Sequence, residues 1–579
     1  MQKPGSPRII KSPYTIDIPP IDVATFVFSS GTASSRQKPQ YFDATSPSKC
    51  YSLAQAEGFV KRVGLGFQRL GLKPDDKVLL YSNNRLFFPV LLWGTIAAGC
   101  VFTAASPSAS ASELEYQLRD SEARTLITSP DTASIALKAA TKAGLPRDRV
   151  YLFCDPEEDL KRHASLQLRP WTDIWASVEE SSSWSWRKIT TLEDAMSTTA
   201  VLNYSSGTTG LPKGVEISHY NLVANAEQVV FKRNIVGNTP EGRARKARVD
   251  ASGERWLAPL PMYHAYGQTY YCINAPLIGA KVFIMPKFTI DTYLLYLDIY
   301  HVTTLTAVPT IMVMLTKQSH PERYNLHAVE TAGCGSAPLN GDIGRLVEKM
   351  YFRPGVHVKQ GWGMTECTCS VAGFAPDDVD DGSSVGLLNP NCWAKIVPVE
   401  DRDFKSGTGS AESDGEVVGE LWVSGPNVMK GYYKKPEATA DTIVYEDGVR
   451  WLRTGDVAYI DKRERIYIVD RLKELIKVKG LQVSPTELEL ALLTHPSVAD
   501  AAVTSAKING NEYPRGFIVQ KKGAPAVTEQ ELADMIKRNF APHKWLTGGV
   551  YFIDAIPRTG SGKVMRRALP NPDPKGSKL

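Results

Sequence analysis

Short apolar and β-branched runs alternate with segments of helical periodicity over most of the chain. The clearest strand-like runs cover residues 78–81, 125–128, 150–153, 281–284 and 303–307. Buried strands of a parallel sheet read as continuous apolar runs, and the segments between them supply the crossover helices. The pattern therefore predicts an α/β protein with mostly parallel sheets.

The pattern changes in the last third of the chain. A stretch rich in Gly, Ser and Asp at 403–415 predicts a surface loop, and runs at 419–423 and 465–469 predict a β-rich section. Beyond Arg471, a helix-forming segment and three strand-like runs form an independent α+β set, at 487–493, 501–504, 516–519 and 550–553. A chain of 579 residues also exceeds the length at which a single core stops growing.

We therefore predict three parts. A large N-terminal domain of α/β sheets with a β-rich subdomain covers 1–471, and a small, mobile α+β domain covers 472–569. An extended tail covers 570–579, where alternate prolines disfavour regular structure. No internal repeat is evident.

The tail ends in Ser577, Lys578 and Leu579. This tripeptide is the C-terminal address that the import receptor of peroxisomes reads. The prolines before it would hold it extended and accessible. The sequence thus predicts a peroxisomal protein with the import receptor as one partner.

The overall charge gives little indication of a nucleic-acid partner. Hydrophobic residues make up 43% of the chain and charged residues 22%, which excludes a disordered, collagenous or coiled-coil protein. The net charge is +5, and the densest basic stretch is 233–255. No aromatic residues interleave with those charges, so we expect a solvated insertion and no nucleic-acid site.

Two segments bear on export and on membrane insertion. Residues 1–20 have no apolar core and do not resemble a signal peptide. The apolar run 86–105 is long enough to span a bilayer, but it contains Pro89, Gly94 and Gly99. We expect a helix followed by a strand at 101–104, and no membrane span.

The cysteines predict neither disulfides nor zinc. Eight cysteines are unevenly spaced, and Cys367 with Cys369 lacks the second pair that a structural zinc site needs. Free thiols in a reducing compartment are the better interpretation.

The segment SSGTTGLPKG, from Ser205 to Gly214, is the most informative. It follows an apolar run at 200–202 and combines hydroxyls, glycines and one lysine, as in a loop that wraps phosphate oxygens. A Walker loop needs Gly before the lysine and Ser or Thr after it, whereas Lys213 stands between Pro212 and Gly214. The loop is therefore a phosphate-binding candidate of another type.

This segment resembles the signature loop of the adenylate-forming superfamily. That superfamily includes acyl-CoA synthetases, coumarate-CoA ligases, beetle luciferases and the adenylation domains of peptide synthetases. Six further motifs occur in the same order and cover nearly the whole chain, from about Tyr51 to Arg567: LPMYH at 260–264, GCGSAPL at 333–339, QGWGMTE at 360–366, WLRTGD at 451–456, DRLKELIKVKG at 470–480 and PRTGSGK at 557–563.

The resemblance implies a nucleotide site for ATP and AMP. In-line attack on the α-phosphate needs positive charge on both sides of the phosphorus. Glu366 would hold Mg²⁺, Trp362 would stack on the adenine, and Asp456 would accept from the ribose hydroxyls with Arg471 as a donor. The full set implied for ATP or AMP binding is Ser205, Ser206, Gly207, Thr208, Thr209, Gly210, Lys213, Gly335, Ser336, Ala337, Gln360, Gly361, Trp362, Thr365, Asp456, Arg471 and Lys473.

The resemblance also implies acyl and coenzyme A sites. By itself His264 reads as a buried core histidine, but in its motif it is similar to the histidine near the substrate carboxylate. Tyr263, Tyr266 and Gly335 would form the acyl pocket. The residues implied for contact with coenzyme A are Lys287, Lys479, Gly480 and Gln482.

The two half-reactions imply a moving domain. The small domain would rotate about a hinge near Lys473, so that Lys563 serves adenylation and Lys477 serves thioester formation. Lys563, His264 and Lys477 are thus the implied catalytic residues.

The predicted function is an ATP-dependent acyl-CoA ligase of the coumarate-ligase-like branch. It would form acyl-AMP from an aromatic, hydroxycinnamate-like or medium-chain acid and transfer the acyl group to coenzyme A. Residues 367–373 are small and neutral, so we expect nothing there to pair with a second charge on the substrate.

Three alternatives remain open. They are a luciferase-like oxygenase, a stand-alone adenylation enzyme that loads a carrier protein, and a non-enzymatic scaffold. No carrier domain follows Lys563, which disfavours carrier loading in this chain. A scaffold would be expected to have lost Lys563 or Glu366, and both are present.

Overall fold

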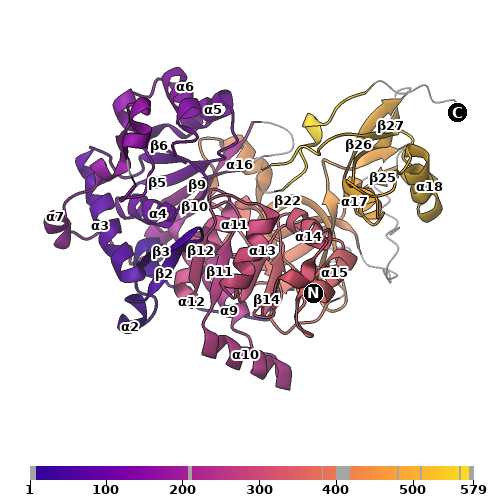
Figure 1. Ribbon diagram of the computed structural model, residues 1–579, viewed down its shortest axis with the longest axis horizontal. Coiled ribbons are helices and arrows are strands. Elements are labelled where there is room, and N and C mark those ends of the chain that lie inside the picture. Colours follow the sequence, from indigo (N-terminus) through magenta and orange to yellow (C-terminus); the bar gives the residue numbers. More distant parts are fainter. Residues whose placement is uncertain are drawn as a thin grey trace.

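Two large sheets of mostly parallel strands form the bulk of the molecule, and a smaller domain lies beside them (Figure 1). The computed structural model describes residues 8–158, 160–205, 211–380, 382–399, 417–478, 481–508, 511–559 and 562–572. This mixed α/β architecture, with a large N-terminal and a smaller C-terminal domain, confirms the fold class predicted from the hydrophobic pattern.

The first large sheet has eight strands. Its order is β20 (Gly431–Tyr432), β10 (Lys213–Ser218), β9 (Thr199–Ser205), β5 (Val101–Ala105), β4 (Lys77–Tyr81), β6 (Ala123–Thr128), β7 (Val150–Leu152) and β8 (Arg169–Pro170). The strands from β9 to β8 are parallel, and β10 is antiparallel to both neighbours. The associated helices are α3 (Leu53–Arg69), α4 (Phe88–Ala97), α5 (Ala111–Ser121) and α6 (Ala133–Ala143).

The second large sheet has seven strands and carries much of the site described below. Its order is β15 (Val358–Gln360), β14 (Thr331–Cys334), β13 (Thr304–Ala307), β11 (Arg255–Ala258), β12 (Lys281–Ile284), β2 (Pro39–Asp43) and β3 (Ser46–Ser52). All neighbouring strands are parallel except β2 and β3. Its helical segments are α9 (His219–Arg233), α11 (Ala265–Thr269), the π-helical turn η4 (Tyr270–Asn274), α12 (Ala275–Ile278), α13 (Ile290–Ile299), α14 (Pro309–Thr316) and α15 (Gly341–Tyr351).

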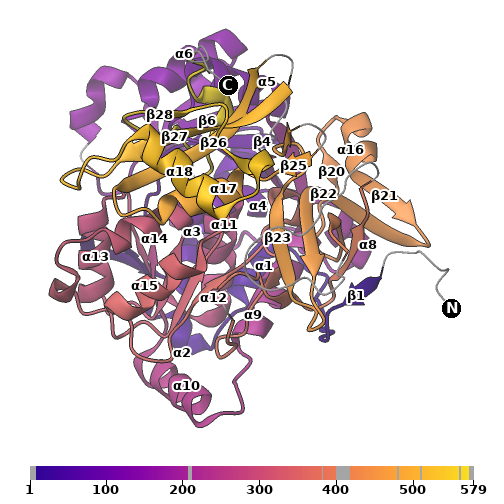
Figure 2. The same ribbon diagram turned by 90° about the vertical axis from the view of Figure 1, so that its right-hand side faces the viewer.

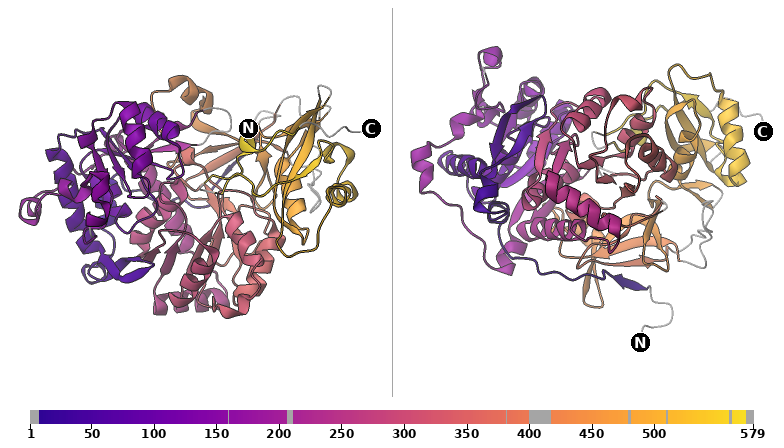
Figure 3. Two further views of the ribbon diagram at one scale, coloured as in Figure 1. Left: turned by 45° about the horizontal axis from the view of Figure 1, so that its top comes forward. Right: turned by 60° about the horizontal axis from the view of Figure 1, so that its bottom comes forward.

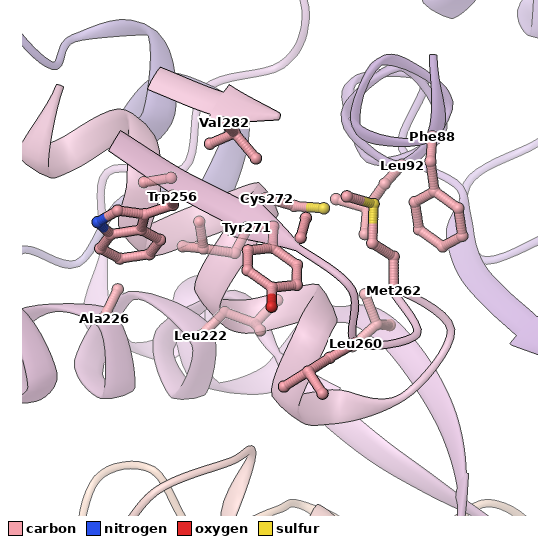
Figure 4. Close-up of a cluster of buried hydrophobic side chains, with 14 of the residues drawn as sticks. Phe88, Leu92, Leu222, Ala226, Trp256, Leu260, Met262, Tyr271, Cys272 and Val282 are labelled. Atoms are coloured by element: carbon pink, nitrogen blue, oxygen red, sulfur yellow. The ribbon is translucent and has the colours of Figure 1, made fainter. Parts of the chain in front are cut away.

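Helices α4 and α9 join the two sheets through one core. Phe88 and Leu92 of α4 belong to the same buried cluster as Leu222 and Ala226 of α9 and Trp256 of β11 (Figure 4). Every residue of α4 is buried, which explains why the run 86–105 is so apolar. The helix and the strand β5 predicted for this run are both present, and no described helix is long and apolar enough to cross a membrane.

A β-rich subdomain follows the two sheets. Its antiparallel strands are β1 (Ile9–Lys11), β18 (Trp393–Val397), β19 (Gly419–Ser424), β21 (Ile443–Glu446), β22 (Val449–Ile460) and β23 (Ile466–Arg471). The loop predicted at 403–415 lies outside the described residues. The shorter elements of the large domain are α1 (Val23–Phe28), α2 (Ala33–Arg36), α7 (Val178–Ser182), α8 (Leu192–Ser197), α16 (Pro436–Thr442), β16 (Ala372–Gly373) and β17 (Leu387–Leu388).

The C-terminal domain has a separate core that includes Val483, Leu488, Val503 and Ile518. Figures 2 and 3 show this domain docked on one side of the large domain. Its elements are β24 (Ile476–Val478), β25 (Leu481–Val483), α17 (Pro485–Leu493), β26 (Val498–Ile508), β27 (Asn511–Gln520), α18 (Glu529–Asn539) and β28 (Val550–Phe552).

The ladder between β22 and β23 ends at Arg471, and the next strand begins at Ile476. We retain residue 472 as the proposed domain boundary. Of the predicted tail, the structure describes residues only as far as 572.

The basic stretch 233–255 differs from the prediction. Residues Pro240–Ser252 form helix α10, which projects from the body in Figure 1. Arg245 is nevertheless buried, and its Nε lies 2.6 Å from Oδ1 of Asp377. The expectation of a solvated insertion is therefore wrong for Arg245, because its carboxylate partner stands far away in the sequence.

Candidate active site

A cavity of about 190 Å³ opens beside the carboxyl ends of β13, β14 and β15. Ligands of open α/β sheets bind at this edge, because connections leave the strands there. The cavity is lined by residues of the large domain and by Lys563 of the C-terminal domain. Gly335, Ser336, Gly361, Trp362 and Thr365 stand on its wall, as do His264 and Tyr266.

Lys563 reaches the cavity from a tight loop of the small domain. Its backbone N–H donates to Oγ1 of Thr559 over 3.1 Å, and Arg558 forms a β-bridge with Val564. Burial lowers the pKa of the Lys563 ammonium to about 8, and the nearby charge of Arg471 adds to that effect. The ammonium is thus held where a negatively charged ligand would stabilise it.

His264 faces the same space from the start of α11. Its Nδ1 accepts from the backbone N–H of Tyr266 over 3.4 Å, which leaves the ring proton on Nε2 when the imidazole is neutral. Burial lowers the pKa of His264 to about 3, and the charge of Lys563 contributes to the shift. At neutral pH the ring is therefore an uncharged N–H donor.

Trp362, Asp456 and Arg471 form a connected polar group. The indole N–H of Trp362 donates to Oδ2 of Asp456 over 2.8 Å. Oδ1 of the same carboxylate lies 3.2 Å from Nε of Arg471. Asp456 is 4% exposed, so it is an oriented, buried acceptor between two donors.

Glu366 presents a buried carboxylate next to this group. Its Oε1 accepts from the hydroxyl of Tyr432 over 2.9 Å, and its charge acts on both Lys563 and Arg471. No cluster of three or more His, Cys, Asp or Glu residues able to hold a metal occurs in the described ranges. A single carboxylate that shares Mg²⁺ with substrate phosphates fits this arrangement, because Mg²⁺ keeps several waters and few protein ligands.

The predicted phosphate loop connects two paired strands. Ser205 ends β9 and lies opposite Lys213 at the start of β10, so the loop leaves and re-enters the sheet at one point. Nζ of Lys213 lies 4.7 Å from the ring centre of Tyr432, beside the Glu366 carboxylate that Tyr432 binds. The predicted residues Ser206, Gly207, Thr208, Thr209 and Gly210 lie outside the described part of the chain.

The segment after β14 is arranged by Gln360. The side-chain Oε1 of Gln360 accepts from the N–H of Leu339 over 2.7 Å, and its Nε2 donates to the Leu339 carbonyl over 3.0 Å. The amide of Gln360 is thus committed to the loop that carries Gly335 and Ser336. Ser336 adopts a φ of 78°, whereas Ala337 does not line the cavity.

The acyl-pocket predictions divide into two groups. Gly335 and Tyr266 line the cavity. Tyr263 does not, and its hydroxyl instead accepts from Ser106 over 3.2 Å. Motif reasoning missed Tyr270, which also lines the cavity and packs edge-on against Tyr266 with ring centres 4.8 Å apart. A tyrosine four residues after Tyr266 on a helix was the available signal.

Residues 367–373 did not represent the whole pocket. Lys232, Arg233 and Lys359 also line the cavity, although they come from α9 and β15. The expectation concerned residues 367–373 alone, and these three charged residues lie outside that segment.

The residues predicted to contact coenzyme A lie elsewhere. Lys477 of β24 is exposed and pairs with Gln482 of β25, so these two share one hairpin. Lys287 and Lys473 are exposed and do not line the cavity. Lys479 and Gly480 lie outside the described residues. In this arrangement the small domain presents Lys563 to the cavity, and Lys477 and Gln482 do not line it.

Comparison with known proteins identifies the family. The model of the AMP-binding enzymes matches residues 32–433, and that of the AMP-binding enzyme C-terminal domain matches 487–563. The chain belongs to the AMP-binding enzymes. It is 31% identical to the phenylacetyl-CoA ligase epaB of Aspergillus niger over 563 residues, which are 96% of this chain and 97% of the relative.

Another relative and a solved structure agree. The peroxisomal OPC-8:0-CoA ligase 1 of Arabidopsis thaliana is 31% identical over 571 residues, 97% of this chain and 95% of the relative. The anthranilate CoA ligase AuaEII in complex with anthranoyl-AMP is 20% identical and superposes with a TM-score of 0.78, over 95% of this chain and 97% of that one. At this identity the last similarity shows the fold alone.

The family establishes the reaction class. This AMP-binding enzyme is an AMP-forming acid–thiol ligase that uses ATP, Mg²⁺ and coenzyme A. The resemblance noted in the sequence is thereby confirmed, and the non-enzymatic alternative is excluded.

Proposed function

We propose that the protein is an ATP-dependent ligase that converts an aromatic, hydroxycinnamate-like or medium-chain carboxylic acid to its acyl-CoA through acyl-AMP. The observation that carries the proposal is the position of Lys563 on the wall of one cavity with His264 and Thr365. Relatives named for phenylacetyl-CoA and OPC-8:0-CoA support an acid of this size range.

In the first half-reaction, the acid's carboxylate attacks the α-phosphate of ATP and pyrophosphate leaves. Lys563 would place its positive charge between the carboxylate and the α-phosphate, where negative charge gathers in the transition state. The Nε2–H of His264 would orient the attacking carboxylate, and Thr365 would bind the α-phosphate. Mg²⁺, held by Glu366, would neutralise charge on the phosphate oxygens.

The nucleotide would lie against the polar group already described. Trp362 would stack on the adenine, next to the backbone of Gly335, Ser336 and Ala337. Asp456 would accept from the ribose hydroxyls, since each carboxylate oxygen can accept more than one donor. Lys213, with the loop that precedes it, would hold the β- and γ-phosphates.

The second half-reaction needs a different face of the small domain. The thiol of coenzyme A attacks the acyl carbon, and AMP leaves. Lys477, Lys479, Gly480 and Gln482 would replace Lys563 after rotation near Lys473. In the present arrangement Lys317 donates to the carbonyl of Val498 across the domain interface over 2.9 Å, and the rotation would have to break this contact.

The reaction is proposed to take place in peroxisomes. Ser577, Lys578 and Leu579 would bind the import receptor. Deletion of Leu579 from the full-length protein should leave ligase activity unchanged and move the protein to the cytosol. Continued sedimentation of the deletion variant with peroxisomes, in cells that lack the intact protein, would contradict this address.

Release of pyrophosphate tests the activity directly. Purified enzyme with ATP and Mg²⁺ is given a panel of aromatic and medium-chain acids, with and without coenzyme A, and acyl-CoA is measured by mass. We expect acid-dependent pyrophosphate release and a matching acyl-CoA. Light emission with a luciferin, or acyl transfer to a carrier protein but not to coenzyme A, would favour the alternatives.

A further inference from the structure

The cavity extends well beyond the reacting end of the substrate. On β14, Thr331 and Gly333 are partly accessible, as is Gly335 just after the strand, whereas Ala332 and Cys334 are buried. Because side chains of a strand alternate between its faces, the first three share the cavity face. The four residue steps from Thr331 to Gly335 span roughly 13 Å at about 3.3 Å per residue.

Two glycines keep this passage open. A Cβ added at Gly333 would lie 3.9 Å from the hydroxyl of Tyr266, and one at Gly335 would lie 3.3 Å from a ring carbon of Tyr266. The opposite wall carries aromatic rings, with Tyr270 packed against Tyr266 and near Trp256. A slender or planar apolar group fits between a glycine floor and aromatic walls.

The far end, at the amino ends of the strands, is polar. Thr304 and Thr331 begin β13 and β14 there, and Arg233 lines the cavity beside them. Lys359 also lines the cavity, from the position on β15 that pairs with Gly333. Nη1 of Arg233 donates to Oγ1 of Thr331 over 3.3 Å, while Nη2 binds Glu254 at 2.7 Å. The Nε of Arg233 has no hydrogen-bond partner within the described ranges.

The single carboxylate on this part of the wall is already satisfied by donors. Both oxygens of Glu330 accept from Arg248, over 2.9 and 3.1 Å, and Arg353 adds a further donor. Glu330 therefore offers little to a second cation. Lys232 is satisfied as well, since its ammonium donates to the carbonyls of Gly373, Leu387 and Leu388.

Lys359 and Tyr270 each have a hydrogen-bond donor that the described residues do not use. The ammonium of Lys359 has three N–H groups and donates to two carbonyls, those of Ala375 and Pro376. The charges of Asp378, Asp377 and Glu348 act on Lys359, although none of them forms an ion pair with it among the described residues. Burial lowers the pKa of Lys359 to about 8, so a nearby anion or acceptor would stabilise its charge.

The Tyr270 hydroxyl likewise has no hydrogen-bond partner among the described residues. Tyr270 is half-buried and lines the cavity. A phenol that borders a cavity and has no protein partner is available to a ligand.

We propose that the acid activated here carries an oxygen acceptor at the end distant from its carboxylate, which Tyr270 and Lys359 bind. The inference rests on the proposed ligase function and narrows its substrate class to distally oxygenated acids. An apolar middle section lies along Gly333 and the aromatic wall. The shared chemistry is a hydrogen-bond acceptor, which a ketone or a second carboxylate could supply.

Matched substrates test this directly. The full-length enzyme is given acids of equal length that end in a methyl, a methyl ketone or a carboxylate, and kcat/KM is measured from pyrophosphate release. Wild-type enzyme should prefer an oxygenated acid over the methyl acid by at least threefold. The methyl acid is the control for the reacting end, since it lacks only the distal acceptor.

Three variants test which residues bind the distal oxygen of the acid. Tyr270→Phe should lower kcat/KM for the preferred oxygenated acid about three- to tenfold more than it lowers kcat/KM for the methyl acid. Lys359→Met should act mainly on the carboxylate-ended acid, by about tenfold or more. Tyr293→Phe is the matched control, because Tyr293 is buried, its hydroxyl has no described partner, and it does not line the cavity.

The outcomes separate the two proposals. No preference in the wild type, or an equal loss for methyl and oxygenated acids in Tyr270→Phe, overturns the distal acceptor site while the ligase function stands. Absence of pyrophosphate release with every acid overturns the ligase proposal itself. A thermal unfolding scan of each variant checks the fold, and Tyr270→Phe alone decides the matter if Lys359→Met does not fold.

Discussion

The two ends of the cavity are built in different ways. At the carboxyl ends of the strands, Trp362 and Thr365 belong to one continuous motif, and Lys563 to another. Along the rest of the cavity, Arg233 is the last residue of α9, Thr331 begins β14, and Lys359 stands opposite Gly333 on β15. The reacting end is assembled from short motifs that each carry several groups, although the motifs lie far apart in sequence, whereas the distal end uses single residues from scattered elements.

The difference follows from what each end must do. Chemistry on a phosphate requires several donors at fixed distances, and a motif that carries more than one donor holds those donors at a fixed spacing. Recognition of a distal group needs only a few donors in the right place. We therefore expect substitutions at the two ends to have separable effects, on the rate with all acids at one end and on the choice of acid at the other.

Lys563→Ala gives the largest expected effect. Loss of its charge should lower acyl-AMP formation by about 10²–10³-fold for every acid, while supplied acyl-AMP and coenzyme A still give thioester. Gly480→Leu should do the reverse, because a side chain would block the approach of coenzyme A. Single-turnover assays of each half-reaction measure both. Loss of the same half-reaction in the two variants would contradict domain alternation, and Lys522→Ala on the exposed surface is the control.

Glu366→Gln has the next largest expected effect. It keeps the shape of the side chain but removes the charge offered to Mg²⁺, so adenylation should fall by about tenfold or more and recover partly at high Mg²⁺. Tyr432→Phe is the control, because it removes only the hydroxyl that binds Oε1 of Glu366. Pyrophosphate release as a function of Mg²⁺ concentration is the measurement. An unchanged Mg²⁺ dependence would show that Glu366 is not the ligand.

Gly333→Val tests whether the acyl group lies along β14. A Cβ at Gly333 would make only ordinary van der Waals contacts, at 3.9 Å from the Tyr266 hydroxyl and 4.0 Å from the Leu305 carbonyl oxygen, so the fold should tolerate the side chain, which would fill the passage. We expect kcat/KM to fall about tenfold for long acids and to change little for acids that end before Gly333. Equal losses for short and long acids would mean that the acyl group does not lie along β14.

The pH dependence should have the smallest effect. The pKa of Lys563 is lowered to about 8, so its charge is present below that pH and is lost as pH rises through it. We expect kcat/KM for ATP to be halved near pH 8 and to be about tenfold lower near pH 9. Lys563→Arg should remove this limb, since a guanidinium stays protonated. A limb that persists in that variant belongs to another group.

Much of the molecule could be predicted from residue order. The apolar runs at 78–81 and 281–284 correspond to β4 and β12, and the run 86–105 resolves into α4 and β5. These predictions succeeded because strands and helices buried on both faces leave continuous apolar signals. The reaction class was likewise readable, because the motifs hold their groups within single loops.

Other features depended on tertiary structure. Helix α10 was predicted as a solvated insertion, but Arg245 is buried against Asp377, 132 residues away in sequence. Residues 367–373 predicted a neutral stretch of the acyl pocket, but the cavity is also lined by Arg233 and Lys359, which come from other elements.

The sequence by itself thus determined the fold class, the order of the elements and the reaction class, since each depends on short-range patterns. Only the tertiary structure decided which distant charges meet, which face of β14 is open and which lysine the small domain presents. Those properties arise from contacts between segments far apart in the chain, and local periodicity carries no record of such contacts.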